Sequence, residues 1–191
     1  LAIDADGDTS FFSENGGYAL TDKNEKQVRV SRNDIADFYA ELTKKYPIVL
    51  IEDCFAYEDG IAWFDLMESI GNKVQLAGDD IFFKQRHERE KMSRIGVGNN
   101  VVVSLDRIIT LSKVYDRAQF AKKYRYKSMI REGLESTEDT MMADMAVGCD
   151  IELIRGGGLC RTDRVAKYNQ MLRIEEELGE DARFYAKYVF A

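Results

Sequence analysis

The sequence predicts an α/β fold built on a parallel sheet, and three observations lead to this prediction. Short apolar runs of strand length alternate with longer segments whose apolar residues recur at helical spacing. Three of the apolar runs end in a carboxylate, at Asp4, Glu52 and Asp79. The 191 residues are 45% hydrophobic, which is enough for one domain with a real core. Since strand–helix–strand repeats build parallel sheets, we expect the three carboxylates at one edge of the sheet.

Strand-forming runs and helical patterns alternate six times along the chain. The expected strands are residues 1–3, 48–51, 74–77, 101–103, 127–130 and 151–154. The expected helices cover residues 35–42, 61–70, a charged run around residue 87, and residues 111–124, 141–147 and 165–178. Ser31 and Asp34 form a capping box before the first helix, Pro47 separates that helix from the second strand, and Gly71 ends the second helix.

The remaining segments carry weaker signals. Residues 6–27 are polar and predict a long loop or a hairpin after the first strand. A second capping box is expected from Ser136, before residues 141–147, and Thr162 and Asp163 are expected to cap the last helix. A closed barrel of parallel strands needs eight strands, so six indicate either an open sheet or about two strands located before residue 1.

Composition excludes several classes of partner and site. The net charge of −7 argues against nucleic acid or an anionic membrane as the main partner. No apolar run approaches the ~20 residues needed to span a bilayer. Three cysteines without C-x-x-C spacing disfavour a disulfide framework or a zinc site and favour the cytoplasm. The chain opens on the apolar Leu1 with no signal peptide, which suggests a fragment whose native start lies elsewhere.

Several motifs are more consistent with structural roles than with chemistry. Residues 4–8 suggest a calcium loop, but Thr9 and Asn15 occupy the positions where an EF-hand needs glycine and glutamate. Three glycines at residues 156–158 could approach a phosphate, although a flexible loop explains them better. His87 lies in a charged run and is interpreted as a solvated helix residue. Cys54 and Cys160 lie near proposed strand ends, and small, partly buried side chains are favoured over reactive thiols.

Five stretches of the chain are similar to enolase. They are residues 46–53, 71–76, 78–80, 163–170 and 172–179. The resemblance runs from Leu1 to about Arg183. It implies an enolase-type TIM barrel of which residues 1–191 form one partial domain, the later six βα units. The first barrel strands and the amino-terminal domain of the family would then lie outside this chain.

The resemblance also implies a metal site and a reaction. Asp4, Glu52 and Asp79 match the three magnesium ligands of the family. The family reaction belongs to glycolysis and dehydrates 2-phosphoglycerate to phosphoenolpyruvate. Removing a proton next to a carboxylate places two negative charges on one end of the substrate, which Mg²⁺ stabilises while a lysine acts as the base.

Other family positions are changed in this sequence. The base lysine falls on Ser104, and the second active-site lysine falls on Arg155. The Ser-His-Arg-Ser motif that holds the substrate phosphate aligns with residues 131–134, so histidine becomes Glu132, arginine becomes Gly133 and serine becomes Leu134. A serine hydroxyl cannot replace a lysine base for a weakly acidic carbon proton, and a carboxylate repels phosphate.

Three hypotheses follow. The first is an enolase-derived, non-catalytic structural or interaction component that still binds Mg²⁺ through its three carboxylates. The second is a divergent active enolase that uses Arg155 or Lys113 as a substitute cation or base. The third is that the three carboxylates are solvated and bind no metal. We expect the partners to be other protein chains or the rest of the barrel, and a homodimer is one form that the resemblance suggests.

Overall fold

The computed structural model describes residues 1–12, 17–21, 24–83, 85–108, 110–133, 135–184 and 189–190. The chain divides into two compact units. The first unit comprises residues 1–99 and residue 190, and the second comprises residues 100–189. Each unit is described by itself below.

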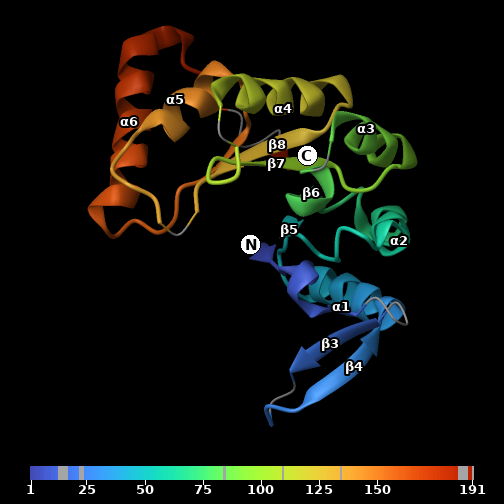
Figure 1. Ribbon diagram of the computed structural model, residues 1–191. Coiled ribbons are helices and arrows are strands. Elements are labelled where there is room, and N and C mark those ends of the chain that lie inside the picture. Colours follow the sequence, from blue (N-terminus) through green and yellow to red (C-terminus); the bar gives the residue numbers. More distant parts are fainter. Residues whose placement is uncertain are drawn as a thin grey trace. The chain divides into compact units, whose positions relative to one another are not determined.

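The first unit contains three parallel strands, each followed by helical structure. The strands are β1 (Ala2–Asp4), β5 (Leu50–Glu52) and β6 (Gln75–Gly78), paired in the order β1-β5-β6. The helices are α1 (Arg32–Lys45), α2 (Gly60–Ile70) and α3 (Arg86–Ile95), and a short 3-10 helix, η3 (Asp80–Phe82), follows β6. In Figure 1 these elements run from dark blue to green.

A small antiparallel sheet interrupts this alternation between β1 and α1. It consists of β2 (Phe11–Phe12), β3 (Gly17–Thr21) and β4 (Gln27–Ser31), and it is preceded by a 3-10 helix, η1 (Gly7–Ser10). β3 and β4 form a hairpin beside α1 (Figure 1). Of the two forms expected for residues 6–27, the described part of this segment is therefore the hairpin.

The helix ends of the first unit follow the predicted caps. The backbone N–H of Asp34 donates to the Ser31 hydroxyl, and the N–H of Ser31 donates back to the Asp34 carboxylate, both at 3.2 Å. This reciprocal pair is the expected capping box of α1. Gly71 ends α2 as predicted, with its N–H donating to the Met67 carbonyl at 2.9 Å. Asp59, which the sequence reasoning did not single out, caps the other end of α2.

The second unit repeats the strand–helix alternation. Its parallel strands are β7 (Asn100–Ser104), β8 (Lys127–Arg131) and β9 (Leu153–Arg155), paired in the order β7-β8-β9. Its helices are α4 (Leu111–Lys123), α5 (Met141–Gly148) and α6 (Thr162–Leu178), followed by a 3-10 helix, η4 (Gly179–Asp181). The expectation of six parallel strands with following helices is confirmed.

Two predicted caps in the second unit are wrong. The N-cap of α5 is Thr140, not Ser136, and the Ser136 hydroxyl instead lies 3.5 Å from the Asp163 carboxylate. α6 begins at Thr162, so Thr162 and Asp163 are its first residues and Arg161 is the N-cap. At Ser136, a contact with a residue distant in sequence takes the place of the expected local cap.

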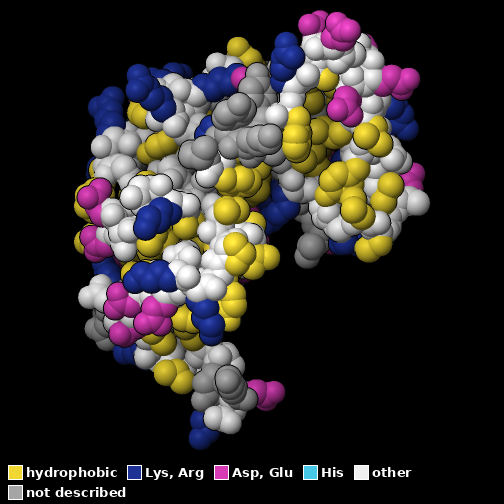
Figure 2. Space-filling view, turned by 180° about the vertical axis from the view of Figure 1, so that it is seen from behind, with side chains coloured by type: hydrophobic (Ala, Val, Ile, Leu, Met, Phe, Trp, Pro, Cys, Tyr) yellow, Lys and Arg dark blue, Asp and Glu magenta, His cyan; other side chains and the backbone are white. Residues whose placement is uncertain are grey.

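The core of each unit is built from the apolar runs and helix faces. Fully buried side chains include Trp63, Phe55 and Leu66 in the first unit and Ile130 and Met142 in the second. Large hydrophobic side chains also reach the surface, and Figure 2 shows them beside charged groups on the face drawn there. No helix in the described part of the chain is both long enough and apolar enough to cross a membrane.

Candidate functional site

The three predicted carboxylates lie at the carboxyl ends of β1, β5 and β6. Asp4 is paired in register with Glu52, and Glu52 is paired with Ala77, two residues before Asp79. Residues in register on neighbouring parallel strands point to the same face, and side chains along a strand alternate with a period of two. The register therefore places Asp4 and Glu52 on one face at the carboxyl edge of the sheet, and Asp79 lies at the same edge, just past the end of β6.

The environments of the three carboxylates differ. Glu52 is 2% exposed and Asp79 is 1% exposed, whereas Asp4 is exposed. Parallel pairing continues past the strand ends, because the N–H of Ala5 donates to the Glu52 carbonyl at 2.9 Å. Asp79 begins η3, and its carbonyl accepts from the N–H of Phe82 at 3.2 Å. Buried carboxylates are uncommon in proteins unless they are paired, hydrogen-bonded or bound to metal.

Asp53 belongs to this edge although the sequence reasoning did not single it out. Its carboxylate accepts the N–H of Asp79 at 2.9 Å, so it links the ends of β5 and β6. Burial, together with the nearby charges of Asp79, Glu52 and Asp80, raises the pKa of Asp53 to about 8. In the sequence, the position of Asp53 directly after Glu52 could have pointed to it.

A second pair of carboxyl groups lies beside this edge. Asp8 in η1 shares a side-chain hydrogen bond with Asp80 and accepts the N–H of Tyr57 at 2.8 Å. Burial and the contact with Asp80 raise the pKa of Asp8 to about 6. Two carboxyl groups can share a hydrogen bond only if one of them carries a proton. Nothing in the sequence signalled this pair, because its two residues lie 72 positions apart.

The donor chemistry of the edge suits magnesium, since carboxylate oxygens are the ligands that Mg²⁺ prefers. The positions of these side chains support a magnesium site less strongly than their chemistry does. Across the residues that the structure describes, no group of three His, Cys, Asp or Glu side chains is gathered closely enough to hold a metal ion. The case for Asp4, Glu52 and Asp79 as metal ligands therefore rests on their shared edge and their oxygen chemistry, and magnesium binding is treated below as a proposal.

Ser104, at the position of the family's base lysine, is the last residue of β7. It is fully buried and lies in register with Arg131 of β8. Its carbonyl accepts the N–H groups of Arg107 at 3.3 Å and Ile108 at 3.1 Å. The backbone thus turns directly after Ser104, and the side chain at this position is a short hydroxyl with no amine.

Glu132, at the position of the family's histidine, forms an ion pair with a buried lysine. The Nζ atom of Lys167 in α6 lies 3.1 Å from the Glu132 carboxylate. The same Nζ donates to the carbonyl of Asp163 at 2.8 Å and to the carbonyl of Thr137. Lys167 is 1% exposed, so these three acceptors satisfy all three of its N–H donors inside the protein. The sequence reasoning did not identify Lys167, although it lies in a stretch similar to enolase.

The remaining predicted positions comprise two uncharged residues of the family's phosphate motif and two cations elsewhere in the second unit. Gly133 lies against Asp106, because a Cβ atom built on it would come within 3.1 Å of the Asp106 carboxylate. Leu134 lies outside the described residues. Arg155 is the last residue of β9, half-buried and in register with Arg131. Lys113 lies exposed in the first turn of α4.

The triglycine segment has a structural role at its centre. Gly157 adopts a φ of +83°, a conformation that favours glycine, and its carbonyl accepts the Tyr168 hydroxyl at 2.6 Å. A Cβ atom at this residue would lie 2.7 Å from the Arg164 side chain. Glycine is therefore required for close packing against α6. His87 is exposed on α3, as predicted for a solvated helix residue.

A family model described as "Enolase, C-terminal TIM barrel domain" matches residues 1–191. The match agrees with the parallel strand–helix units described above and covers the whole of this sequence.

Proposed function

This chain belongs to the enolase C-terminal barrel family, and we propose that it is a non-catalytic member that serves as a structural or interaction component and binds Mg²⁺. The partial enolase-type TIM barrel supplies the strand ends on which the family builds its site. The proposal concerns what the residues at those strand ends can still do. We propose a cytoplasmic location, because three cysteines without C-x-x-C spacing fit a reducing compartment.

The observation that carries the proposal is the buried serine at the end of β7. The family reaction needs a base that removes a carbon-bound proton, and proton-transfer groups contribute ~10²–10⁴-fold to rates. Ser104 offers a hydroxyl, whose affinity for a proton at neutral pH is far below that of an amine. This single change supports a near-complete loss of the family reaction.

The ion pair of Glu132 supports the same conclusion independently. In the family, the motif that aligns with residues 131–134 holds the phosphate of the substrate. Here Glu132 places a carboxylate in that motif, and Lys167 pairs with it. An anionic phosphate approaching Glu132 would be repelled, and it would compete with a salt bridge that is already formed. The phosphate-binding function is therefore replaced by a contact that stabilises the fold.

Magnesium binding is the part of the family function that the residues still support. Asp4, Glu52 and Asp79 share one edge, and together they bring negative charge to it. A bound Mg²⁺ would neutralise that charge and supply Lewis-acid stabilisation of anionic oxygen atoms. Of the three side chains, Asp4 is the one exposed to solvent, from which such an ion would approach.

The direct test measures phosphoenolpyruvate formation by absorbance, with 2-phosphoglycerate and excess Mg²⁺, using the longest natural form of the protein. We expect no turnover above the rate without protein. Turnover that is abolished by Asp79→Asn would overturn the proposal. It would favour the divergent lyase instead, and Arg155→Met would then test whether that arginine serves as the substitute cation.

Magnesium binding is tested separately by isothermal titration calorimetry. Asp79→Asn removes one charge from the edge and is expected to weaken Mg²⁺ binding at least about tenfold. Asp65→Asn, at an exposed position on α2, is the matched control and should leave binding unchanged. Equal affinity in the two variants would show that Asp79 is not a ligand and that the carboxylates are merely solvated or paired.

A further inference from the structure

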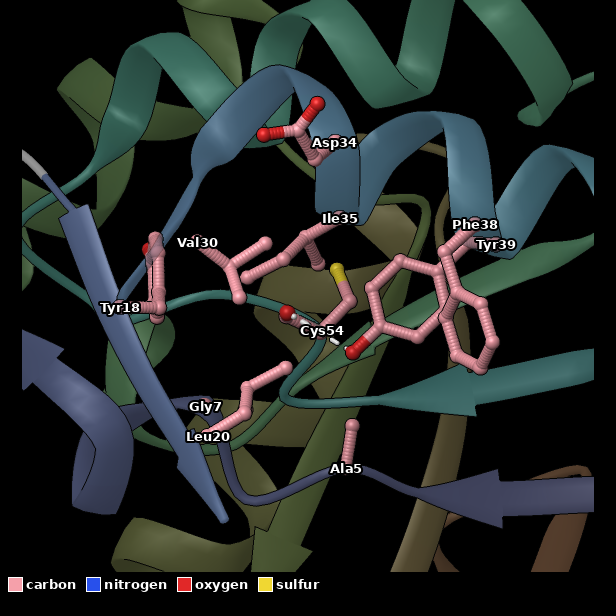
Figure 3. A pocket seen from close by; sticks show the side chains of 10 residues that line it. All are labelled: Ala5, Gly7, Tyr18, Leu20, Val30, Asp34, Ile35, Phe38, Tyr39 and Cys54. Carbon is pink, nitrogen blue, oxygen red and sulfur yellow. Dashed lines mark hydrogen bonds between the residues drawn. The ribbon is translucent and has the colours of Figure 1, made fainter. Parts of the chain in front are cut away.

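The first unit contains a cavity of about 400 Å³ between the β3–β4 hairpin, α1 and the loop after β5 (Figure 3). The hairpin contributes Tyr18, Leu20 and Val30 to its wall. Cys54 lies at its centre, with its sulfur pointing into the space between the surrounding side chains (Figure 3).

The polar groups in the wall are already bonded within the protein. The Tyr18 hydroxyl donates to the Asp59 carboxylate and accepts the N–H of Ala56, both at 3.2 Å. The Tyr39 hydroxyl donates to the Cys54 carbonyl at 3.1 Å, as the dashed line in Figure 3 shows. The two rings therefore present their apolar faces and edges to the cavity, while their hydroxyl groups serve the fold.

The mouth of the cavity combines exposed apolar side chains with one carboxylate. Phe38 on α1 is 55% exposed and Leu20 on β3 is 42% exposed. Asp34 is the only charged residue among those that line the described cavity, and its carboxylate accepts the hydroxyl and N–H of Ser31. This carboxylate would repel an anionic ligand, because no cation lines the described cavity to compensate it. It would not repel a neutral ligand.

We propose that this cavity binds a small, neutral, apolar molecule with at least one ring, held against Tyr18, Tyr39 and Cys54. The volume lies in the range of small-molecule sites and is too small for a peptide helix. Binding would cover part of the exposed surface of Phe38 and Leu20, which supplies the hydrophobic driving force. Because the donors and acceptors in the wall are occupied, hydrogen bonding contributes little and shape sets the selectivity.

Cys54 contacts the ligand without reacting with it. The residue is only 2% exposed, so contact with a ligand, and not reaction with it, is the role that the geometry supports. The cavity adjoins the proposed magnesium edge, since Ala5 follows Asp4 and Cys54 follows Asp53, but dye binding can be measured whether or not Mg²⁺ binds.

The first test titrates the full chain with the neutral fluorescent dye N-phenylnaphthylamine. We expect saturable binding with one site per chain. Ala5→Leu adds bulk at a residue that lines the cavity and should weaken binding at least about tenfold. Ala19→Leu is the matched control: Ala19 is half-buried on β3, does not line the cavity, and alternates with Tyr18 and Leu20. Absence of saturable binding, or equal weakening in both variants, would overturn the proposal.

A second measurement needs no substitution and so stays informative if Ala5→Leu fails to fold. The chain is treated with N-ethylmaleimide with and without the dye, and modification of each cysteine is followed by peptide mass spectrometry. Cys54 and Cys149 are buried and Cys160 is exposed. We expect the dye to slow modification of Cys54 at least about threefold while leaving Cys149 and Cys160 unchanged. Equal slowing of both buried cysteines would indicate general stabilisation and contradict a site at Cys54.

Discussion

Lys167 carries a positive charge that is almost fully buried, and Glu132 is the anion that compensates it. Removing one member of a buried pair leaves the other charge without compensation, which typically costs ~3–5 kcal/mol. We expect Lys167→Met to lower the free energy of unfolding by about 3 kcal/mol, the low end of that range, because Glu132 is partly exposed. Urea denaturation followed by circular dichroism measures this change.

The matched control for this substitution is Lys122→Met. Lys122 also forms a salt bridge, with Asp150 at 2.9 Å, but both side chains are exposed to solvent. Surface pairs contribute ~0–1 kcal/mol, so this variant should unfold close to the unmodified chain. The double variant Lys167→Met with Glu132→Gln should recover part of the lost stability. If the two single lysine variants lose equal stability, the Glu132–Lys167 pair has no special role.

The raised pKa of Asp8 predicts that its contribution to the free energy of unfolding depends on pH. Its pKa is raised from 3.8 to about 6 in the folded chain, so the folded state binds this proton more tightly than the unfolded state. The resulting stabilisation is complete below about pH 4, declines as pH rises and is absent above about pH 6. Asp8→Asn keeps an acceptor for the N–H of Tyr57 and adds a donor for Asp80, so it should be more stable than the unmodified chain above pH 6.

The comparison is made by measuring urea midpoints from pH 4 to pH 8. The difference between Asp8→Asn and the unmodified chain should grow between pH 4 and pH 6 and then level off. Asp65→Asn, at an exposed position, provides the control and should show no such growth. A constant difference across this range would mean that Asp8 does not share a proton with Asp80.

At the scale of single elements, two helix starts differ in their caps. The Ser31 hydroxyl accepts the N–H of Asp34 at the start of α1, whereas Thr140 at the start of α5 makes no side-chain capping bond. Ser31→Ala should therefore cost about 1 kcal/mol, while Thr140→Ala should be nearly neutral. Urea denaturation measures the free energy of unfolding of the two variants. A larger loss of stability for Thr140→Ala than for Ser31→Ala would contradict this prediction.

Elements were predictable from the sequence where local signals agree with burial. The run 48–51 is apolar throughout and follows Pro47, and the described strand β5 covers Leu50–Glu52. The capping box of α1 was also readable, because both of its residues are local. Ser136 shows the limit: its sequence fits a cap, yet its hydroxyl lies near Asp163, which is 27 residues away.

The contrast between local signals and contacts of distant segments also explains which site residues were predictable. Strand ends placed Asp4, Glu52 and Asp79 at one edge, and the register agrees with that placement. The links that Asp53, Asp8 and Lys167 make depend on contacts between distant segments, for which a single sequence holds no local pattern. The cavity around Cys54 belongs to the same class, because the hairpin and α1 enclose it only after folding.

At the scale of the whole molecule, the edge of β1 leads us to expect that the chain associates with another chain. Among the described strands of the first unit, β1 ends the order and pairs with β5 along one side. Ala2 on this strand is exposed, and exposed strand edges invite pairing with another chain. We expect sedimentation velocity to show self-association or aggregation as concentration rises, and Ala2→Lys to reduce it because a charge on an edge strand opposes pairing.

Leu159→Lys controls for the general effect of added charge, since Leu159 is 79% exposed and lies outside any strand. It should leave association unchanged. A chain that stays monomeric at all concentrations and resists proteolysis as one cooperative unit would show that β1 needs no covering partner. That result would also weaken the proposal that other chains or further barrel segments complete the protein.

The carboxylate of Asp59 serves three elements at once. It accepts the N–H of Ala62 at the start of α2, the hydroxyl of Tyr18 from β3, and the guanidinium of Arg32 from α1 at 2.9 Å. Effects of substitutions that share one partner do not add, so changes at Tyr18, Arg32 and Asp59 are energetically coupled. A substitution at one of these residues therefore changes the cost of substituting the other two, and the sequences of related proteins should tend to vary at the three positions together.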